Sequence, residues 1–297
     1  MRLIEDNGNT YIKELKDFSL GQTMECGQCF HFQKLAEGEY GLVASHRFLH
    51  AKQEGDELCL YDTSIEDAKN FWIEYFDLDR DYGAIKKKLL GEDDKLREAV
   101  QTMWGVRILN QEFFETLISF IISQNKQIPH IKKIVATISK LYGDKLAEME
   151  GYEFYSFPTI EQMKNVTEED LKECKTGFRA PYIRDAVVRM AAGEFDENAL
   201  RNMSVAECNE MLTHIKGVGP KVANCVSLFG LGHREAFPVD VWIKRIVETL
   251  YFDGNETAVE KIGQFGTERF GKYGGYAQQY LFYYGKSIKA GKNINKV

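Results

Sequence analysis

The sequence predicts an α+β fold, in which an N-terminal antiparallel β-sheet domain at residues 1–105 precedes a mostly α-helical region at residues 106–297. Between about residues 10 and 62, short runs of β-forming side chains are separated by Glu-Gly and Gly-Asp turns. From Asn110 onward, apolar side chains recur every three or four positions, which is typical of helices packed on a core. The composition changes near residue 105, where we place the domain boundary.

The first helical signal follows the predicted strands. Ser64-Ile-Glu-Asp has the spacing of a capping box, and the next residues place four aromatic rings on one helical face. Further short helices are expected up to about Trp104. These segments connect the β-rich part of the chain to the helical region.

Two long apolar stripes open the helical region, at residues 113–121 and 128–141, with a polar loop at residues 123–127 between them. Capping-box spacings at Thr159, Thr167 and Ser204 predict the starts of three more helices. The last of these helices leads into a Gly-Val-Gly turn.

Length and composition restrict where the protein works. With 297 residues, 44% of them hydrophobic, the chain can bury the cores of two domains. It has no run of about 18 apolar residues, and acids interrupt its first ten residues where a signal peptide needs an apolar stretch. We therefore expect an intracellular monomer without membrane partners, in the cytoplasm or nucleoid of a bacterium or the nucleus of a eukaryote.

The cysteines do not predict a metal site. Of the six, only Cys26 and Cys29 form a C-x-x-C, and no second pair has metal-site spacing. A disulfide framework is not expected inside a cell. We expect no metal and no organic cofactor.

Charge is distributed unevenly. The net charge of −7, from 38 basic and 45 acidic residues, argues against a general nucleic-acid coat. Residues 214–246 nevertheless carry five bases and two acids, and residues 120–142 carry four lysines and no acid. This pattern fits a localised DNA-facing surface, although ordinary solvated helix faces would look the same.

The segment Ile215-Lys-Gly-Val-Gly-Pro-Lys predicts a helix–hairpin–helix. Gly217 and Gly219 permit a tight turn around Val218, and the amides of such a turn can point at a phosphate oxygen. Pro220 suits the first position of the second helix. A plain helix–helix connection would have the same local pattern.

Two charged residues give this hairpin a chemical role. Lys221 falls in the first turn of the second helix, where the helix dipole favours a neutral amine, which is a nucleophile. Asp240, nineteen residues later, precedes a helical pattern as an N-cap, so we expect helix amides to hold its carboxylate ionised. A fixed carboxylate can stabilise a developing positive charge on a sugar. Separately, each residue also fits an ordinary structural role.

Together, G-V-G-P-K and the P-V-D segment resemble the helix–hairpin–helix, Gly/Pro-Asp superfamily of DNA glycosylases. The resemblance implies a catalytic aspartate at Asp240 and, as in the members that also cleave the strand, a nucleophilic lysine at Lys221. Segments elsewhere narrow the resemblance to 8-oxoguanine DNA glycosylases over nearly the whole chain. It implies a bifunctional glycosylase/lyase that flips 8-oxoguanine out of double-stranded DNA, excises it through a lysine Schiff base and cleaves the strand by β-elimination.

The resemblance also assigns residues that choose the base. Gly27, within Cys-Gly-Gln-Cys-Phe, would accept the imidazole-ring proton of oxidised guanine through its carbonyl. Gln278 would bond the pairing edge of the base, while Phe282 and Cys225 would sandwich its ring. Asn125 would fill the gap left by the extruded base. Turn formation, helix ending and core packing explain each of these residues separately.

Some positions depart from the better-known eukaryotic pattern. Trp242 stands where a phosphate-contacting histidine is usual, and His130 stands where an arginine would read the opposite cytosine. Phe178, beside Arg179, replaces a tyrosine wedge. These differences predict a relaxed preference for cytosine opposite the lesion. A glycosylase for another lesion and a non-enzymatic DNA-binding module remain the alternatives.

Overall fold

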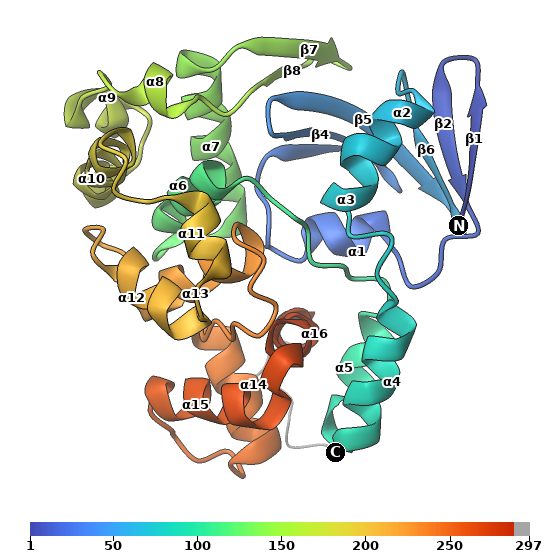
Figure 1. Cartoon of the computed structure of the whole chain (residues 1–297), viewed down its shortest axis with the longest axis vertical. Coiled ribbons are helices and arrows are strands. Elements are labelled where there is room, and N and C mark those ends of the chain that lie inside the picture. Colours follow the sequence, from blue (N-terminus) through green and yellow to red (C-terminus); the bar gives the residue numbers. More distant parts are fainter. Residues whose placement is uncertain (288–297) are drawn as a thin grey trace.

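The computed structural model describes residues 1–287 and confirms the α+β class, with an antiparallel sheet beside a helical region (Figure 1). The last ten residues of the predicted second domain, 288–297, lie outside the described residues. The sheet has six strands in the order β1-β2-β6-β5-β4-β3, and every neighbouring pair is antiparallel. The strands are β1 (Arg2–Asp6), β2 (Asn9–Lys13), β3 (Phe32–Ala36), β4 (Glu39–Ala44), β5 (Arg47–Glu54) and β6 (Glu57–Leu60).

The strands turn where the sequence has its glycines. Gly38 and Gly55 adopt φ values of +71° and +61° in the tight turns before β4 and β6. The expectation of strands throughout residues 10–62 is wrong in one place, because α1 (Leu20–Glu25) interrupts them. Ser19 caps this helix by accepting a hydrogen bond from the Gln22 amide.

The expected helical connection begins at Ser64, whose hydroxyl accepts a hydrogen bond from the Asp67 amide. One helical run follows, with a wider π-turn in its middle. Two further α-helices, with a short 3-10 helix between them, lead to residue 102. The elements are α2 (Ile65–Asp67), η1 (Ala68–Trp72), α3 (Ile73–Tyr75), α4 (Tyr82–Glu92), η2 (Asp94–Leu96) and α5 (Arg97–Thr102).

The helical region contains the two long helices that the apolar stripes predict, and capping boxes form at Thr159, Thr167 and Ser204. Its helices are α6 (Phe113–Ser123), α7 (Ile128–Tyr142), α8 (Ile160–Met163), α9 (Glu168–Glu173), η3 (Gly177–Arg179), α10 (Ala180–Ala191), α11 (Glu197–Asn202), α12 (Val205–Thr213), α13 (Pro220–Phe229), α14 (Val241–Tyr251), α15 (Val259–Phe270), η4 (Gly271–Tyr273) and α16 (Gly274–Ser287).

A hairpin formed by β7 (Lys145–Met149) and β8 (Tyr152–Tyr155) interrupts the helices, which the sequence analysis did not expect. Glu150 and Gly151 both have positive φ values, of 50° and 78°, as a tight two-residue hairpin turn requires. Phe154 packs against Phe48 of β5, with ring centroids 4.6 Å apart, so the hairpin extends from α7 toward the N-terminal sheet (Figure 1).

Two hydrophobic cores organise the molecule. The smaller lies between the N-terminal sheet, α1 and the helical run at residues 65–75. The larger joins the helical region to α4 and α5, through residues such as Tyr82, Leu89 and Val100. These two helices precede residue 105 in the sequence but pack with the helices that follow it. The boundary at residue 105, which we placed where the composition changes, therefore remains a prediction.

The fully buried side chain of Gln28 joins the two parts. Its Nε2 donates to the carbonyls of Thr23, at 3.0 Å, and Arg107, at 2.7 Å, while its Oε1 accepts from the Leu109 amide at 2.9 Å. Its carbonyl accepts a further hydrogen bond from Gln111 Nε2. The loop after α1 is thereby attached to the segment that enters α6.

Replacing Gln28 by Leu should destabilise the protein strongly. Leucine matches the size of glutamine but leaves the buried Arg107 carbonyl and the Leu109 amide without this partner, and it removes one of two hydrogen bonds to the Thr23 carbonyl. The loss costs about 3 kcal/mol or more in the free energy of unfolding. Urea denaturation followed by circular dichroism measures the change. Gln264→Leu, at an exposed position of α15, is the control and should shift the midpoint little. Equal midpoints for the two variants would contradict the proposed importance of Gln28.

Candidate active site

A small pocket brings together the six residues that the sequence analysis assigned to catalysis and base recognition. They come from the loop after α1, from α13, from the N-cap of α14 and from α16. The cavity volume is only about 50 Å³. The predicted residues that line it are Gly27, Lys221, Cys225, Asp240, Gln278 and Phe282, and Phe120, Phe229, Pro238 and Gln279 complete the wall.

Lys221 enters this pocket because Pro220 starts α13 and places the lysine in its first turn. The Nζ atom lies 3.4 Å from Ser123 Oγ and 5.0 Å from the centre of the Phe120 ring. The side chain forms no salt bridge with a carboxylate among residues 1–287. The nitrogen of Lys221 therefore contacts a hydroxyl and an aromatic face at the wall of the pocket, and the lysine is half-buried.

Asp240 is the N-cap of α14, as predicted. Its Oδ1 accepts hydrogen bonds from the amides of Trp242, at 2.9 Å, and Ile243, at 2.8 Å. Burial nevertheless raises the pKa of the Asp240 carboxyl above its ordinary value, and the helix amides and Lys221 only oppose this effect. The helix amides bind the carboxylate as the sequence analysis expects, while desolvation of the charged form is the larger influence on its pKa.

The walls of the pocket leave little freedom for substitution. Gly27 has a φ of +89°, and a Cβ atom there would lie 3.1 Å from Ile128 Cδ1 and 3.4 Å from Phe282 Cε1. Cys225 is buried, and burial raises the pKa of its thiol, which favours the uncharged thiol in this wall of the pocket.

Gln279 is a pocket residue that the sequence analysis missed. Its Nε2 donates to Gln278 Oε1 at 2.7 Å, and Gln278 Nε2 donates to the Pro238 carbonyl at 3.1 Å. The buried Oε1 of Gln279 has no partner among the described residues. An unpaired buried oxygen is unfavourable, so it marks a position where a ligand can donate. The signal in the sequence is the second glutamine of an otherwise apolar helical segment.

The hairpin turn offers backbone groups rather than side chains. Gly217 has a φ of +78°, and a Cβ atom there would collide with the Tyr182 ring. Val218 is buried, and its amide donates to the Ile215 carbonyl at 3.0 Å. Within residues 1–287 the amides of Gly219 and Lys221 donate to no other group, so they can bind a phosphate oxygen.

The other predicted DNA contacts lie outside the small pocket. Asn125, with a φ of +51°, and His130 are exposed between α6 and the first turn of α7. Phe178 is 54% exposed in η3. Trp242 is half-buried in the first turn of α14. The structure therefore presents three of these side chains to solvent and one partly so.

Arg179, which the sequence analysis predicts as a DNA contact beside Phe178, has a buried side chain in the structure. It is only 2% exposed, and its guanidinium stacks 4.2 Å from the centre of the Phe178 ring. It donates to the carbonyls of Thr176 and Gln124. In this structure it joins the Phe178 turn to the loop that carries Asn125.

The two cysteines of the C-x-x-C point in different directions. Cys26 lies in the larger hydrophobic core and Cys29 in the smaller. Among the described residues no three His, Cys, Asp or Glu side chains are grouped in a way that could hold a metal ion. No helix of residues 1–287 has the length and apolar character needed to cross a membrane.

Two family models match the chain in succession. The model of the 8-oxoguanine DNA glycosylase N-terminal domain matches residues 10–117. The model of the HhH-GPD superfamily of base excision DNA repair proteins matches residues 118–270.

Known proteins resemble the chain over most of its length. The 8-oxoguanine glycosylase/lyase of Clostridium acetobutylicum, solved with double-stranded DNA containing cytosine opposite 8-oxoG, is 40% identical, with a TM-score of 0.93 over 97% of this chain and 99% of that one. MBOgg1, solved with a low-affinity DNA ligand, is 41% identical with a TM-score of 0.92 over the same shares. The N-glycosylase/DNA lyase OGG1 of Arabidopsis thaliana is 28% identical over 90% of this chain and 77% of that protein.

Gly217→Ala should lower both thermal stability and affinity for duplex DNA. The added methyl group imposes strain at a positive φ and displaces the turn from Tyr182, which should weaken DNA binding by about tenfold or more through misplaced phosphate bonds. Fluorescence anisotropy with a labelled duplex measures the loss.

Gly219→Ala is the matched control, because its φ is −98° and no atom lies within 4 Å of the new Cβ. Its melting temperature should stay unchanged, so a loss of DNA affinity in this variant reports on the approach of phosphate alone. A Gly217→Ala protein with normal melting and normal DNA affinity would contradict the assignment of the turn.

Proposed function

Because the chain belongs to the 8-oxoguanine DNA glycosylase family within the HhH-GPD superfamily of base excision DNA repair proteins, we propose that it excises 8-oxoguanine from duplex DNA and then cleaves the strand. The observation that carries the assignment of its residues is the convergence of Lys221 and Asp240 in one pocket with the predicted base-binding residues. Lys221 supplies the nucleophile, and Asp240 supplies the negative charge.

In this proposal the hairpin holds the DNA backbone without recognising sequence. The open amides of Gly219 and Lys221 bind a phosphate, and Trp242, in the first turn of α14 after Asp240, adds a further backbone contact. The exposed side chains of Asn125 and Phe178 enter the duplex where the damaged base has left. Extrusion of the base costs a few kcal/mol, which the contacts in the pocket offset.

The pocket must open before a base can enter. Its volume of about 50 Å³ is far below the roughly 300–1,000 Å³ of typical ligand pockets. Phe282 and Cys225 then separate to take the ring between them. Gln278 bonds the pairing edge of the base, in an orientation that Gln279 and the Pro238 carbonyl fix.

The Gly27 carbonyl provides the discrimination between damaged and normal guanine. Oxidised guanine carries a hydrogen on the imidazole-ring nitrogen that is a bare acceptor in guanine. A carbonyl oxygen accepts a hydrogen bond from the former and faces a second acceptor in the latter, which is unfavourable. Glycine suits this position because any side chain at residue 27 would be strained at a φ of +89° and would crowd Ile128 and Phe282.

The chemistry follows from an amine and a carboxylate beside the sugar. After the Lys221 ammonium loses a proton, its amine attacks the anomeric carbon. The electron pair of the sugar–base bond leaves with the base, which takes up a proton. Asp240 stabilises positive charge on the sugar and assists the proton transfers. The amine then forms a Schiff base with the opened sugar. Loss of a proton from the adjacent carbon breaks the bond to the 3′ phosphate oxygen and cleaves the strand.

Borohydride trapping tests the nucleophile. Reduction of the Schiff base should join the intact protein covalently to a duplex that contains 8-oxoguanine. Lys221→Gln should abolish the adduct, since the amide is not nucleophilic, but should still bind the duplex. Lys216→Gln, on the exposed side of the same hairpin, should still form it. An equally strong adduct with Lys221→Gln would refute the assignment.

The decrease in excision rate at low pH should reflect protonation of the Asp240 carboxylate. The pKa of Asp240 is raised, so as the pH falls its active carboxylate becomes protonated at a higher pH than the carboxylate of an ordinary aspartate. Single-turnover excision across pH, with DNA binding measured at each point, tests this expectation.

Asp240→Asn should remove most of the activity and raise the melting temperature at neutral pH. A raised pKa means that the folded protein favours the uncharged form, so the charged form costs stability as pH rises through that pKa. A variant that loses stability at neutral pH would contradict this account.

Excision opposite adenine should be only about tenfold slower than opposite cytosine. The exposed side chain at the expected reading position is His130, and Arg179 is engaged with backbone carbonyls, so a bidentate contact worth about 1–3 kcal/mol is missing. Single-turnover rates on the two duplexes measure the ratio. His130→Arg should increase the preference for cytosine, and His130→Gln should not. A large preference in the unmodified protein would refute the prediction.

A further inference from the structure

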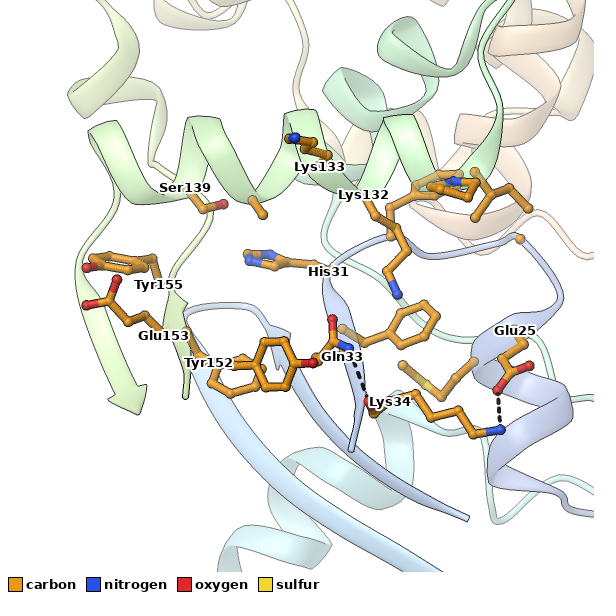
Figure 2. Close-up of a pocket in the computed structure, with 18 of the residues that line it drawn as sticks. Glu25, His31, Gln33, Lys34, Lys132, Lys133, Ser139, Tyr152, Glu153 and Tyr155 are labelled. Atoms are coloured by element: carbon orange, nitrogen blue, oxygen red, sulfur yellow. Dashed lines mark hydrogen bonds and ion pairs between the residues drawn. The ribbon is translucent and has the colours of Figure 1, made fainter. Parts of the chain in front are cut away.

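A second and much larger cavity lies beside the candidate active site. Its volume is about 680 Å³, within the roughly 300–1,000 Å³ range of ligand pockets. Figure 2 shows it between α7, β3 and the β7–β8 hairpin. The proposed mechanism uses only one of its lining residues, Gly27, which also lines the base pocket.

The cavity carries uncompensated positive charge. Four lysines and two glutamates line it. Glu25 pairs with Lys34 at 3.2 Å, and Glu153 is bridged by Lys140 and Lys145. Lys132 and Lys286, two of the four lysines, form no salt bridge within residues 1–287. Burial lowers the pKa of each.

Lys132 is the best placed of these cations. Figure 2 shows its side chain extending from α7 into the cavity, with the nitrogen toward β3. The Nζ atom lies 3.6 Å from the centre of the Phe32 ring, its only partner of this kind in the described part of the chain. An aromatic face stabilises an ammonium less than an anion does, so the group is available to an anionic ligand.

A second, independent observation points to a ligand. Ser139, seven residues and so about two turns further along α7, is 1% exposed, lines the cavity, and has a hydroxyl without a hydrogen-bond partner in the described structure. Buried hydroxyls are normally satisfied, so this one marks a place for a polar edge. Five aromatic rings also line the cavity and suit a flat ligand ring, namely Phe30, Phe32, Tyr152, Phe154 and Tyr155.

We propose that this cavity is a second ligand site that binds a nucleotide, with the aromatic base among the rings and the phosphate against Lys132, while Lys286 adds a second positive charge. The site is separate from the base pocket but abuts it, because Ile128 lines the large cavity and its Cδ1 is the atom nearest to a Cβ at Gly27. Binding there is independent of base excision and can be measured without it.

Isothermal titration calorimetry of the full chain tests the proposal with deoxyguanosine monophosphate, deoxyguanosine and inorganic phosphate. The nucleotide should bind with a stoichiometry of one. Deoxyguanosine alone and inorganic phosphate alone should each bind more weakly, by about tenfold or more. Its affinity should fall as salt is raised. No binding of the nucleotide, or binding of phosphate as tight as that of the nucleotide, would overturn the proposal.

Four variants locate the ligand. Lys132→Gln should weaken binding about tenfold, since it removes the charge but keeps the stem. Ala136→Phe, at an exposed position of α7 that lines the cavity, should block binding by filling the space. Lys87→Gln, on α4 away from the cavity, and Gln278→Ala, in the base pocket, should bind normally. Thermal melting verifies that each variant is folded.

The opposite pattern, with binding lost in Gln278→Ala and kept in Ala136→Phe, would place the ligand in the base pocket and refute the proposal. Equal weakening by Lys87→Gln would also refute it. A titration in the presence of saturating undamaged duplex then distinguishes two sources of the nucleotide. Continued binding identifies a free nucleotide as the ligand, whereas displacement by duplex identifies a nucleotide of the DNA strand.

Discussion

The buried amide of Gln28 holds the site in register with the rest of the fold. It bonds to Thr23 on one side and to Arg107 and Leu109 on the other. Because Gly27 is its immediate neighbour, these bonds place the carbonyl proposed to recognise the base relative to α6 and the helices beyond it. In the proposed function, the β-sheet domain contributes through this loop, whose position depends on three buried hydrogen bonds of the Gln28 side chain.

The electrostatics of the pocket depend on a balance between burial and capping. The amides of Trp242 and Ile243 favour the charged form of Asp240, whereas the apolar surroundings oppose it more strongly. A carboxylate kept under such conditions is poorly solvated and interacts strongly with nearby positive charge. This arrangement lowers stability in the free protein and favours a cationic sugar, so the same feature that costs folding energy assists the proposed reaction.

The sequence predicts best what is encoded locally. The hairpin, the capping boxes and the N-cap at Asp240 depend on residues a few positions apart, and the structure has them. The β7–β8 hairpin was missed because its contact with Phe48 is remote in sequence. Gln279 and the burial of Arg179 also depend on packing between distant segments. The large cavity could not be predicted, since α7, β3 and β8 are brought together only by the fold.

The buried Arg179 has a consequence for how the protein meets undamaged DNA. Its guanidinium fastens the turn with Phe178 to the carbonyl of Gln124, immediately before Asn125. In the proposed mode of DNA binding, these contacts hold the exposed side chains of Phe178 and Asn125 in fixed relative positions as one probe. A repair enzyme inspects very many intact base pairs for each lesion that it finds. Side chains that are already ordered lose little conformational entropy at each encounter. Testing a base pair can therefore be brief and have a small free-energy cost.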